Sequence, residues 1–257
     1  MNRIMRYILA ILFFSMFSPI SSFAADATRP VLRWHGQSFF DLTTTKGTRI
    51  VFDPHAIDVY GRQSVPADLV LISHFHNDLT QVGILSNPGK FKVLEGLKRA
   101  GNKVEWNLLD EKFRDVRVRT VGVYHDNAQG LEKGKNAVFI VEADGLRFVH
   151  LGDLGHLLTK EQAKEIGPVD VLMIPIGGVY TINGTDAKEV IAEIKPKKYI
   201  LPMHYGTKVF DDVLPPDEFL EDQKKESIKR KDTNQLEIDP DFKPPEPEIV
   251  LLDWKQP

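Results

Sequence analysis

Short apolar runs that end in polar residues dominate the pattern of hydrophobic and polar positions along this chain. The runs at 68–73 and 170–174 are almost continuously apolar, which is typical of short strands buried on both faces. Residues 116–123 alternate apolar and basic side chains, which indicates a strand with one buried face. Other segments with strand character lie at 31–40, 49–52, 91–94, 103–108, 137–142, 146–151, 198–201 and 248–253.

Turn signals connect several of these strands into hairpins. Lys46-Gly47 is expected to form a turn between the first two strands. Asp144-Gly145 is a strong hairpin signal because both residues tolerate the backbone angles of a two-residue turn. The polar, glycine-containing segment 127–136 follows the strand at 116–123 and is interpreted as a mobile loop.

Helices are expected only in the second half of the chain. Thr159 and Gln162 fit a capping box, so a helix should begin there and end near residue 166. Thr185 is expected to cap a second helix over 186–194. The basic run at 224–231 is interspersed with acids and is interpreted as a helix with a solvated face.

The order of these elements predicts the fold class. A β-rich first half is followed by strands that alternate with helices, which suits an α/β fold of two packed mixed sheets with outer helices, a four-layer αββα sandwich. The site is expected along the edge between the sheets. No repeat of fixed period and no second domain is evident, so residues 25–257 are expected to form a single domain.

The first 24 residues have the organisation of a secretory signal peptide. A basic start precedes an apolar run over residues 7–17, and Ser22 and Ala24 supply small residues at positions −3 and −1. A transmembrane anchor is the alternative, but the run is too short to span a bilayer and is interrupted by Ser15. Cleavage near Ala24 is therefore expected, giving a periplasmic or secreted protein without a stable membrane anchor.

Charge and cysteine content exclude several classes of function. The formal net charge is −3, and signal cleavage makes it more negative because the signal segment carries arginines and no acid. This balance argues against nucleic acid as a partner and leaves a small-molecule substrate as the expectation. The chain has no cysteine, which excludes disulfides, thiolate metal ligands and a cysteine nucleophile.

Three polar side chains at every second position follow the buried run at 68–73. They are His74, His76 and Asp78. In an extended segment such positions point to one side, so two imidazoles and a carboxylate converge at the carboxyl end of a strand. Imidazole and carboxylate are ligands that zinc, manganese and iron accept. A polar loop that happens to contain two histidines is the plainer alternative.

Three further candidate ligands follow predicted strands: His125, Asp153 and His204. The order His-x-His-x-Asp, a lone His, Gly-Asp and a late His resembles the metallo-β-lactamase superfamily. The sequences Gly-Asp-Leu-Gly-His at 152–156, Ile-Pro-Ile-Gly-Gly at 174–178 and Pro-Met-His-Tyr at 202–205 are similar to its broad hydrolase branch. That branch includes ascorbate-phosphate lactonase-like and phospholipase D-like enzymes.

The resemblance implies a specific division of ligands. His74, His76 and His125 would form a first metal site, and Asp78 and His204 a second, with Asp153 bridging the two. Zinc is the expected metal, as one or two ions, with manganese or iron as alternatives. Asp78 and Asp153 are thereby implied in catalysis as well as in metal binding.

Two positions qualify this division. The family usually has histidine where this chain has Leu79, which removes one donor from the second site. His156, three residues after Asp153, is interpreted as a catalytic group facing the substrate, with a second-site ligand and a surface histidine as alternatives.

The remaining polar residues at strand ends are expected to support the site or the core. Asp53 either orients a ligand histidine or forms a turn before a proline. His35 and His55 are interpreted as structural histidines, and His150 as a core residue.

Together with the expected signal peptide, the resemblance implies an exported metal-dependent hydrolase. A metal-bound hydroxide would attack an ester, lactone or phosphodiester. The alternative is a degenerate relative that binds a metal or ligand without turnover, and Leu79 is the feature that favours it.

Overall fold

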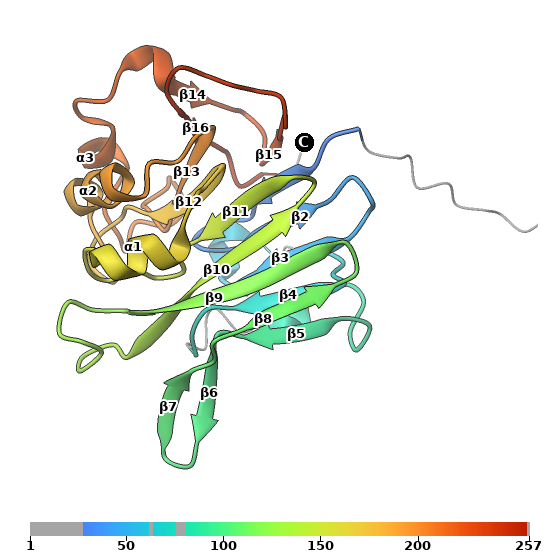
Figure 1. Cartoon of the computed structure of the whole chain (residues 1–257). Coiled ribbons are helices and arrows are strands. Elements are labelled where there is room, and N and C mark those ends of the chain that lie inside the picture. Colours follow the sequence, from blue (N-terminus) through green and yellow to red (C-terminus); the bar gives the residue numbers. More distant parts are fainter. Residues whose placement is uncertain (1–27, 62–63, 76–80, 256–257) are drawn as a thin grey trace, which may run out of the picture.

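The computed structural model describes residues 28–61, 64–75 and 81–255. Two mixed sheets pack face to face, as Figure 1 shows, and this arrangement is the α/β sandwich expected from the sequence. The predicted signal peptide and its cleavage site lie outside the described residues. Within the described part of the chain, no helix has the length and apolar character needed to cross a bilayer.

The first sheet has six strands in the order β15-β1-β2-β3-β4-β5. They are β1 (Val31–Trp34), β2 (Phe40–Thr43), β3 (Arg49–Phe52), β4 (Leu69–Ile72), β5 (Lys92–Glu95) and β15 (Gln235–Glu237). The first three run antiparallel, whereas β3, β4 and β5 are parallel. Parallel pairing makes these last strands present their carboxyl ends at one edge.

The second sheet has eight strands in the order β14-β16-β13-β12-β11-β10-β9-β8. They are β8 (Asp110–Phe113), β9 (Val116–Tyr124), β10 (Lys135–Ala143), β11 (Leu146–His150), β12 (Val171–Pro175), β13 (Tyr199–Met203), β14 (Ile228–Arg230) and β16 (Glu248–Leu251). A separate hairpin of β6 (Leu97–Ala100) and β7 (Lys103–Trp106) projects from the sandwich.

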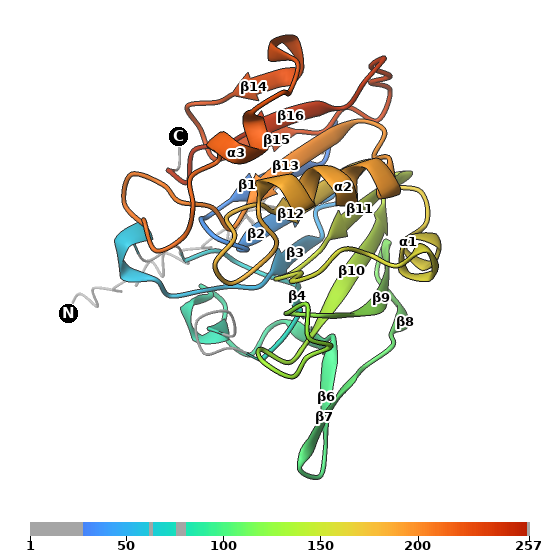
Figure 2. The same ribbon diagram turned by 90° about the vertical axis from the view of Figure 1, so that its left-hand side faces the viewer.

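The α-helices of the described residues cover the second sheet. They are α1 (Lys160–Ile166), α2 (Gly184–Ile194) and α3 (Asp217–Leu220). Figure 2 shows α1 and α2 lying across the outer face of this sheet. The described connections beside the first sheet contain the short 3₁₀ helices η1 (Asp58–Tyr60) and η2 (Val82–Ile84). The outer layers are therefore unequal, and the described α-helices lie on one side.

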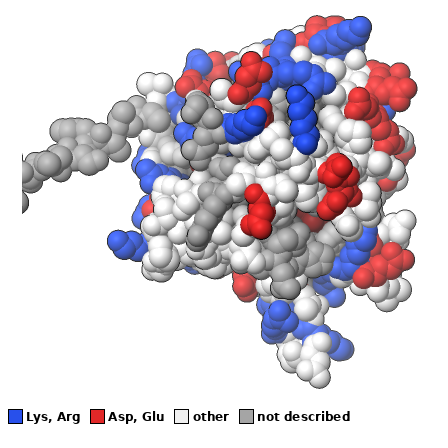
Figure 3. All heavy atoms as spheres, turned by 180° about the vertical axis from the view of Figure 1, so that it is seen from behind, with Lys and Arg blue, Asp and Glu red and all other residues white. Residues whose placement is uncertain are grey.

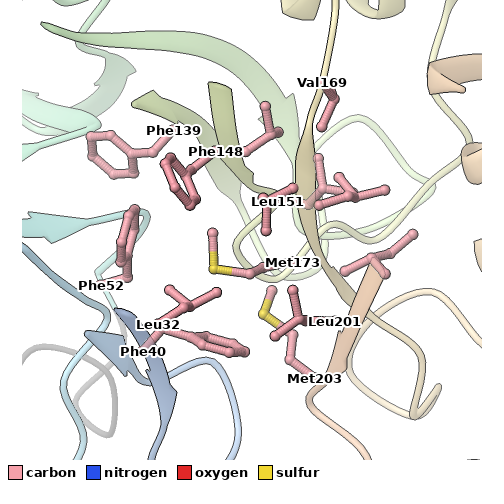
Figure 4. Packing of buried hydrophobic residues seen from close by; sticks show 14 of the residues in the cluster. Leu32, Phe40, Phe52, Phe139, Phe148, Leu151, Val169, Met173, Leu201 and Met203 are labelled. Atoms are coloured by element: carbon pink, nitrogen blue, oxygen red, sulfur yellow. The ribbon is translucent and has the colours of Figure 1, made fainter. Parts of the chain in front are cut away.

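The main core fills the space between the two sheets. Phe40 and Phe52 from the first sheet meet Phe139, Phe148 and Met173 from the second, and all five side chains are almost fully buried (Figure 4). Each such side chain stabilises the fold by roughly 1.5–3 kcal/mol relative to exposure. The two sheets are thus held in a fixed mutual position, which in turn fixes the edge where their strands end.

Most predicted strands are confirmed, but the segment 31–40 is not one strand. It forms β1 and the start of β2, separated by a tight turn in which the His35 N–H donates to the Phe39 carbonyl. Gly36 allows this turn because its φ is +97° and a Cβ there would lie 2.7 Å from the Tyr60 ring. Strand β6 was also not predicted, because two of its four residues are basic and three are exposed.

The predicted cap of the second helix is wrong by two residues. Asn183 caps α2 by accepting a hydrogen bond from the Asp186 N–H, and the Thr185 hydroxyl instead donates to the Glu218 carboxylate at 2.7 Å. The capping box of α1 is confirmed, with Thr159 and Gln162 bonded reciprocally.

The helix predicted over 224–231 is wrong. The segment forms the 3₁₀ helix η3 (Lys225–Ser227) and then β14, which pairs in parallel with β16. Ile228 packs against the core, so pairing with an apolar neighbouring strand outweighs the helix propensity of the charged residues.

Candidate metal centre

Four strands deliver polar side chains to the same edge of the sandwich. His74 follows β4 of the first sheet, while His125, Asp153 and His204 follow β9, β11 and β13 of the second. All four are buried, with exposed fractions between 1% and 6%. The prediction that strand ends bring these residues together is met by the structure.

The three imidazoles converge on one carboxylate oxygen. The Nε2 atoms of His74 and His125 lie 3.6 Å from Asp153 Oδ2, and His204 Nε2 lies 3.3 Å from it. Candidate donor atoms of His74, His125 and Asp153 all lie within 4.8 Å of one another. This spacing suits ligands that share one cation, because each donor can approach the same central point.

The electrostatics of the cluster keep Asp153 ionised. Burial raises the pKa of its carboxyl group, but the nearby imidazoles, His204 first and then His74, outweigh burial and hold that pKa well below its usual range. The Ser38 hydroxyl donates a hydrogen bond to Asp153 Oδ1 at 2.8 Å. One carboxylate oxygen is therefore held by serine while the other faces the imidazoles.

The orientation of His74 follows from a short relay behind it. The Ser73 hydroxyl lies 2.7 Å from Asp53 Oδ2 and 2.8 Å from His74 Nδ1. An ionised carboxylate can only accept, so the hydroxyl donates to Asp53 and its oxygen accepts from Nδ1–H of His74. The other ring nitrogen of His74, Nε2, then faces Asp153 Oδ2 at 3.6 Å. Of the two interpretations of Asp53, the structure supports orientation of a ligand histidine, acting through Ser73.

Unusual backbone angles accompany the cluster. His204 has a φ of +49° and Gly152 has a φ of +56°. A Cβ on Gly152 would lie 2.3 Å from Asn136 Oδ1, so only glycine fits before Asp153. Left-handed backbone at a non-glycine residue costs about 1–3 kcal/mol and tends to occur at functional sites.

The structure does not place all of the predicted site residues in this cluster. His76, Asp78 and Leu79 lie outside the described residues. His156 is described, but both of its ring nitrogens bond the main chain: Nε2 lies 3.0 Å from the Tyr124 nitrogen and Nδ1 lies 2.7 Å from the Leu157 oxygen. These bonds leave neither nitrogen directed at a substrate.

The remaining histidines are buried and hydrogen-bonded, as expected for structural residues. His35 bonds the Asp41 carboxylate at 2.7 Å, and His55 donates to the Gly36 carbonyl at 3.0 Å. His150 donates to the Ser38 carbonyl at 2.9 Å and stacks on Phe52. Burial lowers the pKa of both His55 and His150 to about 4.

Sequence reasoning missed the supporting serines. The sequence pattern does not point to Ser73, although Ser73 directly precedes the ligand candidate His74, and that position is a detectable signal. Ser38 lies 115 residues before Asp153 and gives no local signal. Only the packing of the two sheets brings Ser38 and Asp153 together.

A polar cavity of about 280 Å³ lies beside the cluster, lined by residues that include Asp126, Lys133, Gly155 and Tyr180. The ring of Tyr180 is 6.5 Å from that of His204, and its side chain is half exposed. Lys133 donates from Nζ to the Val179 carbonyl at 2.9 Å, which ties the two walls of the cavity together.

Two mixed sheets with a His/Asp cluster along their shared edge define a hydrolase of the metallo-β-lactamase class, and comparison with known proteins places the chain there. Residues 31–204 match the β-lactamase superfamily domain, so the chain belongs to this family. The match ends at the last histidine of the cluster.

Relatives of this chain carry a more specific description. A protein of Thermococcus onnurineus described as a UPF0173 metal-dependent hydrolase is 29% identical over 193 residues, covering 68% of this chain and 84% of the relative. A hydrolase with the same description from Thermus thermophilus is 30% identical over 190 residues, with the same coverage. The chain is accordingly a metal-dependent hydrolase of the metallo-β-lactamase superfamily.

Solved structures agree with this placement. A candidate zinc-dependent hydrolase of the metallo-β-lactamase superfamily from Thermotoga maritima is 36% identical, with a TM-score of 0.66 over 87% of this chain and 98% of that one. A candidate metal-dependent hydrolase from Parabacteroides distasonis is 21% identical, with a TM-score of 0.54 over 75% of this chain and 89% of that one, and supports the fold alone.

Proposed function

We propose that this protein is an exported hydrolase that holds one or two divalent metal ions between its sheets and cleaves an ester, lactone or phosphodiester. The observation that carries the proposal is the convergence of three imidazole nitrogens on one oxygen of Asp153. His74, His125 and His204 supply the described imidazoles, and His76 and Asp78 are proposed as the remaining ligands.

The donor set fits a metal of the zinc type. Buried imidazoles around an ionised carboxylate are the nitrogen and oxygen donors that zinc prefers, and manganese and iron also accept them. Ser73 and Ser38 orient His74 and Asp153 by hydrogen bonds, which is the support that metal ligands usually receive. Zinc is therefore the proposed metal.

When bound at such a site, the metal supplies a water molecule of lowered pKa and positive charge for a developing oxyanion. The protein's own contribution is to hold the ligands in place and to limit access of water. Asp153 remains ionised because the surrounding imidazoles stabilise its charge. Its fixed orientation by Ser38 places negative charge at the centre of the cluster.

The substrate is proposed to be a small molecule that enters beside the cluster. The polar cavity between the loop after β9 and residues 178–183 has room for a small polar group. Acidic and basic side chains intermingle on the face shown in Figure 3, apart from a basic projection at its lower end. That mixture and the net charge of −3 favour a small molecule over nucleic acid.

The test combines metal content with hydrolysis. Purified protein reconstituted with zinc should retain one tightly bound ion after dialysis against a weak chelator, and a second ion should bind less tightly because Leu79 donates no lone pair. His125→Ala should lose most of the tight ion and all hydrolysis of an ester, lactone and phosphodiester panel. His35→Gln is the matched control, since His35 bonds Asp41 and lies outside the cluster.

Retention of the tight ion by His125→Ala would contradict the proposed ligands. A wild-type protein that binds zinc tightly but hydrolyses nothing in the panel would instead favour a role in binding without turnover. Export is tested separately by N-terminal sequencing of the protein recovered outside the cytoplasm, which should begin near Ala25. Recovery with Met1 intact would contradict signal cleavage.

A further inference from the structure

The tautomer of His156 is determined by its two hydrogen bonds. The Tyr124 main-chain nitrogen can only donate, so His156 Nε2, 3.0 Å away, must be the unprotonated acceptor. Nδ1 then carries the hydrogen and donates it to the Leu157 carbonyl at 2.7 Å. Protonation of Nε2 would break the bond to Tyr124. The ring is thus fully engaged with main chain on both sides.

His156 Nε2 accepts its hydrogen bond from Tyr124, the residue immediately before the ligand candidate His125. Tyr124 is the last residue of β9, and His125 follows it. The Gly155 N–H donates to the Tyr124 carbonyl at 3.0 Å, so both main-chain groups of Tyr124 bond to residues 155 and 156. The His125 N–H donates at 3.0 Å to the carbonyl of Gly134, the residue before β10. The peptide units around His125 are therefore fixed from two directions.

Close packing adds to these bonds. A Cβ on Gly155 would lie only 2.1 Å from the His125 carbonyl oxygen, so a larger residue would displace one segment or the other. Farther along, the Gln162 side chain donates to the Gly122 carbonyl at 3.1 Å and ties the first turn of α1 to the same strand. The segment 155–162 forms a clamp along the end of β9.

We infer that His156 is a positioning residue, which holds the main chain that carries His125 and so fixes that imidazole relative to Asp153. The inference rests on the proposed function in treating His125 as a metal ligand. It replaces the catalytic role expected for His156 from sequence, because a general acid or base needs a ring nitrogen directed at substrate.

The same bonds account for the Gly-His pair as one structural unit. Glycine permits the close approach of the two main chains, and histidine places an acceptor opposite the half-buried N–H of Tyr124 at the end of β9. Without that acceptor, the Tyr124 N–H would remain unsatisfied or recruit water, and the end of β9 could shift. Supporting partners of metal ligands typically contribute 10–100-fold to metal affinity.

Two substitutions separate positioning from catalysis. In His156→Gln, the side-chain oxygen can accept the Tyr124 N–H, but the residue cannot act as an acid or base. In His156→Leu, the acceptor is absent. Two properties are measured for each variant: zinc affinity by competition with a chromophoric chelator, and exchange of the Tyr124 amide hydrogen in the zinc-free protein. His125→Ala serves as the reference for loss of a ligand.

The positioning role predicts zinc affinity about 10–100-fold weaker in His156→Leu, with faster exchange at Tyr124, and near-normal values in His156→Gln. Unchanged zinc affinity in His156→Leu overturns the inference, as does equal weakening in both variants. If His156→Leu does not fold, His156→Gln decides alone, because retained affinity supports positioning and lost affinity contradicts it. Tight zinc binding by His125→Ala would instead show that the proposed metal centre is wrong.

Discussion

At the scale of single residues, serine hydroxyls and main-chain groups decide how the candidate ligands face one another. The Ser73 hydroxyl links the Asp53 carboxylate to the imidazole of His74 by two hydrogen bonds. The Ser38 hydroxyl donates to Asp153 from the first sheet's side of the sandwich. The ligand candidates could be named from the sequence because histidine and aspartate are conspicuous at strand ends. Their supports could not, since serine is common and its role depends on the fold.

Removal of the Ser73 hydroxyl should weaken metal binding. In Ser73→Ala, His74 loses the acceptor that fixes its tautomer, so zinc affinity is expected to fall about 10–100-fold. Chelator competition measures this change. Ser64→Ala is the control, because the Ser64 hydroxyl donates to the Ile84 carbonyl, away from the cluster. Equal zinc affinity in wild type and Ser73→Ala would argue against the relay.

The buried neutral histidines predict loss of stability in acid. The pKa of His150 is about 4 in the folded protein and 6.5 for the free group, because burial disfavours its charged form. Below pH 6.5 the unfolded chain binds a proton that the folded chain does not. The contribution of His150 is therefore fully present above pH 6.5 and is lost progressively as the pH falls to 4, by about 1.4 kcal/mol per pH unit.

Denaturant unfolding of chelator-treated protein between pH 7 and 4 measures this slope. His55 should contribute in the same direction, since burial also lowers its pKa to about 4. In His150→Asn the dependence of the unfolding free energy on pH should be shallower by about 1.4 kcal/mol per pH unit, the contribution of one proton. An identical slope would mean that His150 titrates normally in the folded state.

At the scale of elements, local apolar patterns explain which strands could be predicted, and contacts between distant segments explain which could not. The sequence segments of β4, β9 and β12 were recognisable because short runs of continuous or alternating apolar residues are typical of strands. Strand β14 was mistaken for a helix because its pairing partner β16 lies twenty residues farther along. The break between β1 and β2 depends on Gly36 packing under Tyr60, which is a tertiary contact.

The loop after β9 was expected to be mobile, but one carboxylate organises it. Asp126 accepts hydrogen bonds from four main-chain N–H groups, those of Ala128, Gly130, Glu132 and Lys133. Burial raises the pKa of Asp126, and these bonds outweigh burial and lower it to about 2. Its contribution to stability is therefore present above pH 3.8 and is lost as the pH falls towards 2.

Asp126→Ala should release this loop. The four amide hydrogens should exchange faster, and the free energy of unfolding should fall by on the order of 2 kcal/mol because four half-buried main-chain donors lose a charged acceptor. The exchange rates and the unfolding free energy of Asp126→Asn should lie between those of wild type and Asp126→Ala, since one carbonyl oxygen remains as an acceptor. Hydrogen exchange resolved at single residues makes the comparison. Unchanged protection in Asp126→Ala would show that other contacts suffice.

At the scale of the whole molecule, the candidate metal centre joins the two sheets. His74 comes from the first sheet, and His125, Asp153 and His204 come from the second. A bound metal would therefore add a cross-link to a sandwich that is already held by apolar packing and by hydrogen bonds such as the one from Ser38 to Asp153. The order of strands predicts two packed sheets with the site along their edge. No local pattern shows which residues meet across the sheets, such as Ser38 and Asp153.

Removal of zinc should lower the melting temperature. Free zinc at a hundred times its Kd stabilises the folded state by about 2.7 kcal/mol, and a chelator should abolish this gain. His204→Ala should show a smaller difference between the zinc-loaded and chelated forms. The measurement is thermal unfolding with and without chelator. Equal melting temperatures in wild type would contradict a metal bound preferentially to the folded chain.

The pairing of β15 with β1 has a consequence for biosynthesis. Leu32 pairs with Leu236, and Ile228 in β14 pairs with Ile249 in β16, so an edge strand of each sheet comes from the last thirty residues. A chain that is still emerging from the ribosome leaves the outer edge of β1 unpaired until residue 237 appears. Neither sheet can therefore be completed before residues 228–237 have emerged.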